Sequence, residues 1–294
     1  MKVIQAWLIY DEKSAANNTS YIDWFIDEAQ KKGIMMELVI RNELMSGIKN
    51  NQSILIRDGR EVPSPEVAVV RTIDPLLSSH LEELGTLVFN SSRVAKICNH
   101  KALTYKEVQK LSLPMVDTFF YQRHTLPEQP PLDFPFVMKS VHGRGGNEVF
   151  LIEDEKTWSR IKDTFPSDEM VVQTANVQPG KDVRVFVVGN EIIAAVRRES
   201  RKDFRANFSL GGSAKLYPLS EKETEMVQRI CRHFKFDMVG VDFLIDLDGN
   251  LLFNEIEDIV GSRTLSKLTD INLLDLYTSH ILNKWQQSQK TKNS

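Results

Sequence analysis

The stretch GVDFLIDLDGNLLFNEIED, residues 240–258, constrains the fold most, because it alternates like two strands around an Asp-Gly turn. A two-residue loop at that turn places Asp242 directly opposite Glu255. Side chains directly opposite one another have Cβ atoms about 5 Å apart, and like charges there destabilise a sheet. Glu257 lies two residues beyond Glu255 and therefore on the same face. We expect a positive charge between these carboxylates.

Three carboxylates on one face form an oxygen-only site. Such a site suits a hard cation, Mg²⁺ or Mn²⁺, which is often shared with phosphates. Spacing alone leaves open an alternative, an acidic hairpin whose charges point into water. A calcium loop of the EF-hand type fits poorly, because Leu251 occupies the position that needs glycine and the flanking segments read as strands.

The composition is that of an ordinary globular chain of 294 residues, with 41% hydrophobic and 26% charged residues. A net charge of -3 provides no overall positive field, so we expect neither nucleic acid nor a membrane as partner. Cys98 and Cys231 lie far apart without CxxC spacing, which is typical of a reduced, cytoplasmic protein. No apolar run approaches the length of a transmembrane helix.

The order of the expected elements indicates an α+β fold. Segments 3–9, 20–32 and 36–40 read as strand, helix and strand, the pattern of a small α/β unit. The remainder reads as antiparallel hairpins with intervening helices, and the polar end, residues 286–294, is expected to fray. The expected domains are an N-terminal α/β domain at 1–92, a central lobe with a glycine loop at 93–173, and a C-terminal lobe with the acidic hairpin at 174–294.

The segment KSVHGRGG, residues 139–146, supplies candidate phosphate-binding groups. Lys139 ends a buried strand, and the glycines Gly143, Gly145 and Gly146 let the backbone approach a phosphate closely. It is not a Walker A loop, because no Gly-Lys-Ser/Thr follows and the chain returns to a strand. By itself this pattern is equally consistent with a plain turn.

Several arginines follow strands or lie on them, and arginine suits phosphate and carboxylate recognition because its planar fork is always charged. Arg71 ends the apolar strand 67–71, the position where open α/β sheets bind ligands, although a surface pairing with Asp74 is an equal alternative. Arg184 lies on an apolar strand, and Arg197 and Arg198 close the next one.

Taken together, these residues resemble the ATP-grasp ligases, and more narrowly the RimK-like family, which adds amino acids to carboxylates. The resemblance covers most of the chain after about Arg71 and is strongest between Asp182 and Glu257. Each motif is loose alone, but their order and spacing together are specific. The matching motifs are NHKALTYKEVQKLSLPMV, FVMKSVHGRGGNEV, VVQTANVQPGKDVRVFVVG, FRANFSLGG, GVDFL and NEIE.

The resemblance implies that ATP lies between two α+β lobes, with adenine beside a hinge strand and the phosphates under the glycine loop, which acts as a mobile lid. Lys101 and Lys139 would hold the phosphates, and Asp182 would bind the ribose hydroxyls. The implied ATP-binding residues are Lys101, Lys139, Gly143, Gly145, Gly146, Gln173, Thr174, Ala175 and Asp182.

The same resemblance implies a catalytic role for Arg205 and Asn207, which would contact the γ-phosphate and the acyl phosphate made from it. Arg71, Arg184 and Arg197 are the weaker candidates for holding the carboxylate substrates. Two Mg²⁺ or Mn²⁺ ions would be bound by the hairpin carboxylates Asp242, Glu255 and Glu257.

The implied function is an ATP-dependent carboxylate–amine ligase that forms a peptide or amide bond through an acyl phosphate. Its partners would be an amino acid such as glutamate and a carboxylate on a small molecule, peptide or protein, and homo-oligomers are common in the family. Two departures from the family pattern are Glu257 in place of asparagine and DIVG, residues 258–261, in place of Ser-Pro-Gly. A catalytically silent ATP-binding regulator and a kinase-like enzyme remain as alternatives; the retained charges argue against the regulator.

Overall fold

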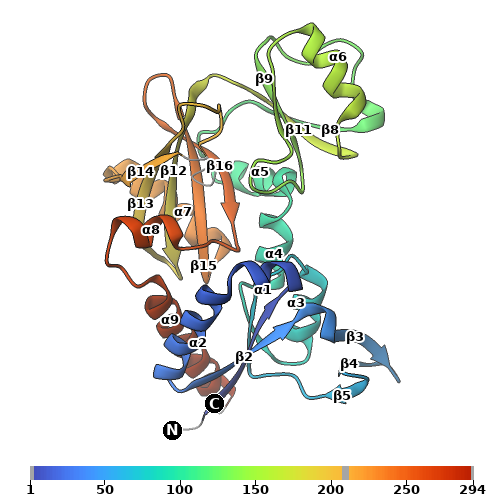
Figure 1. Cartoon of the computed structure of the whole chain (residues 1–294), viewed down its shortest axis with the longest axis vertical. Helices are drawn as coiled ribbons and strands as arrows, with labels where there is room; N and C mark the ends of the chain where they lie inside the picture. The colour runs from blue at the N-terminus through green and yellow to red at the C-terminus, as the bar shows by residue number, and fades with distance from the viewer. Residues whose placement is uncertain (1–2, 207–211, 293–294) are drawn as a thin grey trace.

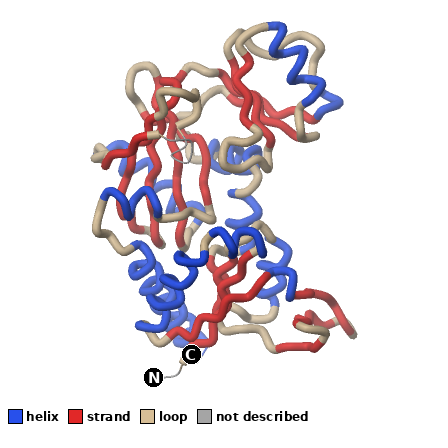
Figure 2. Tube along the Cα trace, in the orientation of Figure 1, coloured by secondary structure: helices blue, strands red, loops and turns tan. Residues whose placement is uncertain are grey.

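The computed structural model describes residues 3–206 and 212–292. These residues form three lobes along an elongated molecule (Figure 1). A parallel sheet lies near the two termini, and two antiparallel sheets with their helices form the other end (Figure 2). This arrangement confirms the predicted α+β class. Within the described ranges, the chain has no helix with the length and apolar character needed to cross a membrane.

A four-stranded parallel sheet forms the N-terminal lobe, in the order β2-β1-β6-β7. Its elements are β1 (Ile4–Tyr10), α1 (Glu12–Asn17), α2 (Thr19–Lys31), β2 (Ile34–Ile40), β6 (Val67–Val70), α3 (Pro75–Glu83) and β7 (Leu87–Phe89). β1 pairs in parallel with β2 and β6, as the strand–helix–strand pattern predicts. Phe25 of α2 packs with Leu8 on one face, and Leu81 of α3 packs with Ile9 on the other.

A small antiparallel arm leaves this lobe between β2 and β6 and was absent from the sequence prediction. It consists of η1 (Arg41–Glu43), β3 (Leu44–Lys49), β4 (Gln52–Arg57) and β5 (Arg60–Val62). Its two turns, Asn50-Asn51 and Asp58-Gly59, have positive φ angles throughout. Turns of this kind match the right-handed twist of a hairpin. The Asn and Gly residues at these positions were the available signal.

The second lobe is a four-stranded antiparallel sheet in the order β10-β9-β11-β8. Its elements, with the two helices that precede it, are α4 (Ser92–Cys98), α5 (Lys101–Gln109), β8 (Thr118–Gln122), η2 (Arg123–Thr125), β9 (Phe136–Ser140), β10 (Val149–Ile152), α6 (Glu155–Thr164) and β11 (Glu169–Thr174). Trp158 of α6 is fully buried against Phe136 of β9. β9 and β10 pair as predicted, and the glycine loop, residues 143–146, connects them.

The third lobe is a five-stranded antiparallel sheet in the order β14-β13-β12-β15-β16. Its elements are β12 (Val177–Val188), β13 (Glu191–Glu199), β14 (Ser213–Leu216), α7 (Glu221–Phe234), β15 (Met238–Asp246), β16 (Leu251–Glu257), α8 (Arg263–Leu268) and α9 (Leu273–Lys292). Val227 and Ile230 of α7 pack with Val183 and Val185 on one face. The other face carries the charged residues described below.

The acidic hairpin pairs Asp242 with Glu255 as predicted, but through a different turn. Asp246 and Asn250 close the turn through a backbone hydrogen bond of 2.9 Å, so the loop has three residues instead of two. The resulting one-residue shift is reversed by a bulge between Asp242 and Phe243, where Asn254 is the extra residue of β16. The bulge therefore restores the pairing that the shorter turn would have produced.

Helix α9 returns the C-terminus to the N-terminal lobe, where the rings of Tyr277 and Phe25 lie 5.6 Å apart. The predicted frayed tail is wrong for most of its length, because α9 continues to Lys292. Lys284 supports the helix through a 2.7 Å ion pair with buried Asp237. The domain boundaries proposed after residues 92 and 173 fall within α4 and near the end of β11.

Candidate active site

A cleft lies between the two antiparallel sheets, with β9, β11 and the glycine loop on one side and β12, β15 and β16 on the other. Apolar side chains, among them Val116, Val137 and Leu244, form part of its wall. Such a wall suits a flat aromatic ring. The predicted residues that line the cleft are Lys101, Lys139, Gly143, Gly145, Gly146, Gln173, Thr174, Ala175, Asp182, Arg205, Asp242 and Glu255.

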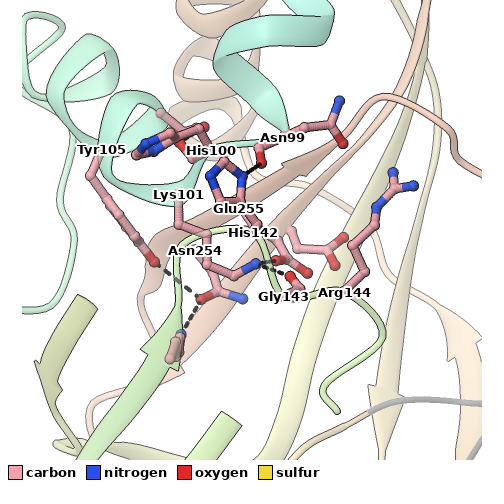
Figure 3. Close-up of polar contacts among 12 residues, drawn as sticks. Asn99, His100, Lys101, Tyr105, His142, Gly143, Arg144, Asn254 and Glu255 are labelled. Atoms are coloured by element: carbon pink, nitrogen blue, oxygen red, sulfur yellow. Dashed lines mark hydrogen bonds and ion pairs between the residues drawn. The ribbon is translucent and has the colours of Figure 1, made fainter. Parts of the chain in front are cut away.

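The glycine loop is held at both ends by basic side chains. Lys101 donates to the carbonyl of Gly143, as drawn in Figure 3, and Arg205 donates to the carbonyl of Gly146. Both cations therefore bind backbone carbonyl oxygens in this structure. The partners expected from the sequence are phosphate oxygens of ATP. Arg205 is also held by Asp203, at 2.7 Å, so its position is fixed by the segment that precedes it.

Lys139 is buried at the base of the cleft and donates to the side-chain oxygen of Asn254 at 3.0 Å. Burial lowers the pKa of Lys139 to about 8, and the nearby Glu255 carboxylate opposes this effect. Asn254 is the bulge residue of β16, and the hydroxyl of Tyr105 lies 3.5 Å from the same oxygen. The bulge therefore directs the neutral side-chain oxygen of Asn254 toward Lys139. Burial makes the charged form of this lysine unfavourable.

A row of alternating charges crosses the third sheet beneath the cleft. Arg198 makes a two-pronged contact with Asp182, at 2.7 and 2.6 Å. Arg184 makes a similar contact with Asp242, at 2.7 Å for both bonds, and Arg198 reaches the same carboxylate at 2.9 Å. Burial raises the pKa of Asp182 and opposes the arginines, whereas the two arginines outweigh burial at Asp242 and lower its pKa to about 2. Asp242 is therefore ionised.

Arginine and lysine, rather than another group, supply the positive charge expected between the hairpin carboxylates. Arg184 lies 2.5 Å from Glu257, and Lys101 lies 3.6 Å from Glu255. The oxygen-only donors still suit Mg²⁺ or Mn²⁺. Asp242 would have to give up an arginine contact to bind an ion.

A second cavity of about 1210 Å³ adjoins the cleft and reaches the N-terminal lobe. Lys101, Gly143, Gly145 and Glu255 line both cavities. The predicted residues Arg71, Arg184 and Glu257 line the second cavity, together with the cationic side chains of Arg144, Arg198, Arg263 and Lys267.

Arg71 is buried at the junction of the N-terminal and C-terminal lobes. It donates to the Tyr10 hydroxyl at 3.2 Å and to the Val260 carbonyl at 3.0 Å, both of which are neutral oxygens. Asp74, the alternative partner considered from the sequence, instead binds Arg41 at 2.6 Å. Arg71 therefore faces the cavity and is not a surface ion pair.

The prediction of Arg197 needs correction. A two-residue turn forms at Gly189-Asn190, and a bulge between Phe186 and Val187 shifts the register of β12 and β13 by one residue. Asp182 therefore faces Arg198. Arg197 lies on the opposite face, where its nearest acid, Glu199, is 3.9 Å away.

The structure adds residues that sequence reasoning missed. Besides Asn254, they include Arg144 of the glycine loop, which reaches the buried Asp258 at 3.3 Å. Asp258 begins the DIVG segment that departs from the family pattern, so this departure provides an anchor for the loop. The predicted catalytic Asn207 lies outside the described residues.

A family profile described as a RimK-like ATP-grasp domain matches residues 100–279. The chain belongs to the RimK-like ATP-grasp family. The match begins one residue before Lys101 and ends within α9, so it includes both antiparallel lobes of this RimK-like protein.

Curated relatives of this RimK-like chain are named as synthases of glutamate conjugates. Human N-acetylaspartylglutamate synthase A is 31% identical over 71% of this chain and 58% of its own length. Zebrafish (Danio rerio) beta-citrylglutamate synthase B is 28% identical over 83% of this chain and 64% of its own length. The chain thus spans less than two thirds of each of these relatives.

Solved ATP-grasp structures share the fold. D-alanine–D-alanine ligase from Bacillus anthracis, complexed with ATP, has a TM-score of 0.72 at 13% identity and covers 98% of this chain and 99% of its own. The ATP-grasp ligase PsnB, complexed with a minimal precursor, has a TM-score of 0.71 at 14% identity over 97% of this chain and 100% of its own. PsnB has also been solved with Mg and ADP. At these identities the likeness establishes the ATP-grasp fold.

Proposed function

We propose that this protein is an ATP-dependent carboxylate–amine ligase that forms an amide or peptide bond through an acyl phosphate. The observation that carries the proposal is the junction of two cavities. One is lined by the glycine loop and basic groups suited to a nucleotide, the other is lined by cations suited to carboxylates, and Lys101 and Glu255 lie on the wall they share. The γ-phosphate and a carboxylate would meet there.

In the nucleotide cleft, ATP phosphates take the place of the loop carbonyls that now bind Lys101 and Arg205. The lysines at 101 and 139 neutralise phosphate charge. The backbone of the hinge, residues 173–175, meets adenine beside the apolar wall, and Asp182, although bound by Arg198, is the candidate for the ribose. Charge neutralisation and positioning are the main needs of phosphoryl transfer.

The carboxylates Asp242, Glu255 and Glu257 are proposed to hold Mg²⁺ or Mn²⁺, two ions in the form expected from the family. Bound there, the ions would neutralise charge that develops on the phosphates. Arg184 now balances Asp242 and Glu257, so metal binding requires it to release at least one acid. Once released, Arg184 is available for a substrate carboxylate in the adjoining cavity.

The carboxylate substrate is proposed to lie in the larger cavity, against Arg71 and the arginine freed from the acidic row. A carboxylate is a poor electrophile; transfer of the γ-phosphoryl group to one of its oxygens gives an acyl phosphate with phosphate as leaving group. The amine then attacks the acyl carbon, and phosphate departs. Arg144 and Asp258 hold the loop over this junction, which limits hydrolysis by water.

The names of the curated relatives suggest glutamate as the amine and an acidic small molecule as its partner. PsnB has also been solved with a precursor peptide, so a peptide or protein is a second candidate for the carboxylate partner. A screen of phosphate release from ATP and Mg²⁺ should therefore pair each of the twenty amino acids with N-acetylaspartate, citrate and amino acids. Mass spectrometry should find a product one water lighter than the sum of its parts.

Phosphate release that needs both substrates supports the ligase. A stable phosphorylated product without an amide favours the kinase-like alternative, and hydroxylamine trapping separates the two because it intercepts acyl phosphates. ATP binding without turnover across the whole panel favours the silent regulator. Failure to bind ATP contradicts the proposal.

A further inference from the structure

A cluster of three metal-ligating side chains lies beside the glycine loop and takes no part in the proposed ligase chemistry. His100, His142 and Glu169 offer ligand atoms that all lie within 4.8 Å of one another. The two imidazole rings are 4.8 Å apart and edge-on, and His100 Nε2 lies 3.7 Å from the Glu169 carboxylate. Figure 3 shows the two histidines at the start of the loop.

Backbone hydrogen bonds fix the three elements that carry these side chains. The Val141 amide donates to the Glu169 carbonyl at 3.3 Å, and the Lys101 amide donates to the Val141 carbonyl at 2.9 Å. His100 is the N-cap of α5, His142 follows β9, and Glu169 begins β11. The proximity of the ligands therefore results from the fold and does not depend on long flexible segments.

The hydrogen bonding of His142 favours metal binding. Its Nδ1 lies 3.2 Å from the Asn99 carbonyl, which accepts but cannot donate, so Nδ1 carries the proton (Figure 3). The lone pair is then on Nε2. A histidine that binds metal through one nitrogen commonly donates from the other to a carbonyl or carboxylate.

His100 is the second nitrogen ligand. Burial lowers its pKa, as does His142, and Glu169 opposes both. The neutral ring is the form that binds metal. Its Nδ1 now accepts a long, 3.4 Å hydrogen bond from the Leu103 amide. Coordination through Nε2 requires the proton on Nδ1, and a protonated Nδ1 can no longer accept the hydrogen bond from the Leu103 amide. A metal–nitrogen bond would therefore replace this weak N-cap hydrogen bond.

Two imidazoles and one carboxylate are typical ligands of zinc and similar transition ions, and differ from the oxygen-only set of the acidic hairpin. Ligands of a tetrahedral zinc lie about 3.3 Å apart, so ligand atoms that are up to 4.8 Å apart must close by up to about 1.5 Å. His142 and Glu169 are exposed or half-buried and can rotate to do so. Three protein ligands leave a fourth position for water.

We propose that His100, His142 and Glu169 form a binding site for a zinc-class divalent ion that fastens the start of the glycine loop to α5 and β11. The ion would restrain the residue next to Gly143, whose carbonyl Lys101 binds. The site is separate from the proposed magnesium ligands and stands whether or not the chain is a ligase.

The test is titration of the full chain with Zn²⁺ by calorimetry in excess Mg²⁺, with hydrogen exchange of residues 142–147 followed in parallel. We expect one Zn²⁺ per chain and slower exchange of the loop. His142→Ala and Glu169→Gln should each weaken Zn²⁺ binding by about 10- to 100-fold or more. Both replaced side chains are at least partly exposed, so the melting temperature without zinc should stay unchanged.

Matched controls are His124→Ala, which removes an exposed histidine elsewhere, and Glu255→Gln, which alters the acidic site. Both should retain Zn²⁺ binding. Absence of binding by the unmodified chain, or binding that survives both His142→Ala and Glu169→Gln, overturns the proposal. Loss of binding in Glu255→Gln alone would place the ion in the acidic site and also overturn it.

Discussion

Arg184 passes over Gly240 to reach Glu257, which lies 2.5 Å from its guanidinium. Gly240 is the residue paired with Glu257 across β15 and β16. A Cβ on Gly240 would lie 3.3 Å from Cδ and Nε of Arg184 and 2.9 Å from Val260 Cγ2. The absence of a side chain at this position therefore lets one arginine join Asp242 to Glu257.

Gly240→Ala should displace Arg184 and separate the two acids that it joins. We expect a loss of stability of about 1–3 kcal/mol from overpacking and a fall in turnover of at least about tenfold. Gly47→Ala is the control, because nothing lies within 4 Å of a Cβ at that position. Normal turnover in Gly240→Ala would show that catalysis does not depend on the position of Arg184.

Gly180 holds the segment that leads to Arg205. Its φ is +68°, and a Cβ would lie 2.4 Å from the Ser200 carbonyl and 2.8 Å from the Asp203 carbonyl. Gly180→Ala should lower the denaturation midpoint and weaken ATP binding through displacement of Arg205. Gly59→Ala has a similar φ, +73°, with open space around the Cβ. Equal losses of stability in Gly180→Ala and Gly59→Ala would mean that the clash with the two carbonyls adds nothing to the strain of the positive φ.

The position of Lys139 predicts a pH dependence of ATP binding. Its pKa of about 8 means that the free protein loses this charge as the pH rises through 8, whereas bound phosphate requires the charge. ATP binding at pH 9 should therefore take up a proton and weaken relative to pH 7. Calorimetry at both pH values, in buffers with different ionisation enthalpies, measures the uptake. Equal proton uptake in Lys139→Met would assign it to another group.

The same lowered pKa has a consequence for stability. Because the pKa in the folded chain is below the ordinary value of 10.5, folding releases a proton between about pH 8 and 10.5. The charge on Lys139 therefore destabilises the nucleotide-free fold below pH 8, and this effect disappears as the pH rises to 10.5. Lys139→Met should raise the melting temperature at pH 7, and a lower melting temperature would contradict the burial effect.

Glu255 is the acid shared by the two cavities. Glu255→Gln should reduce ATP turnover by about 100-fold or more, through loss of metal and phosphate positioning. Folding stability should change little, because a charge is removed from an acidic cluster. Asp248→Asn, in the exposed turn of the same hairpin, is the control. Strong unfolding of Glu255→Gln without metal would count against the site.

The sequence predicted the α+β class, the glycine loop between two strands and the pairing of Asp242 with Glu255, because these follow from alternation and local turn residues. It did not predict the two bulges, which depend on how each strand fits its neighbours in the sheet. One bulge pairs Asp182 with Arg198, and the other places Asn254 against Lys139. Cross-lobe contacts such as Arg144 with Asp258 also carry no local signal.

In the proposed reaction, a substrate carboxylate attacks the γ-phosphorus of ATP and forms an acyl phosphate. The most direct measurement uses the substrate pair found in the screen, with ¹⁸O in both oxygens of the carboxylate, and mass spectrometry of the phosphate released. If an acyl phosphate forms, each phosphate released should contain one ¹⁸O atom, and one ¹⁸O atom should remain in the amide. Phosphate free of ¹⁸O, with amide still formed, would contradict the proposed reaction.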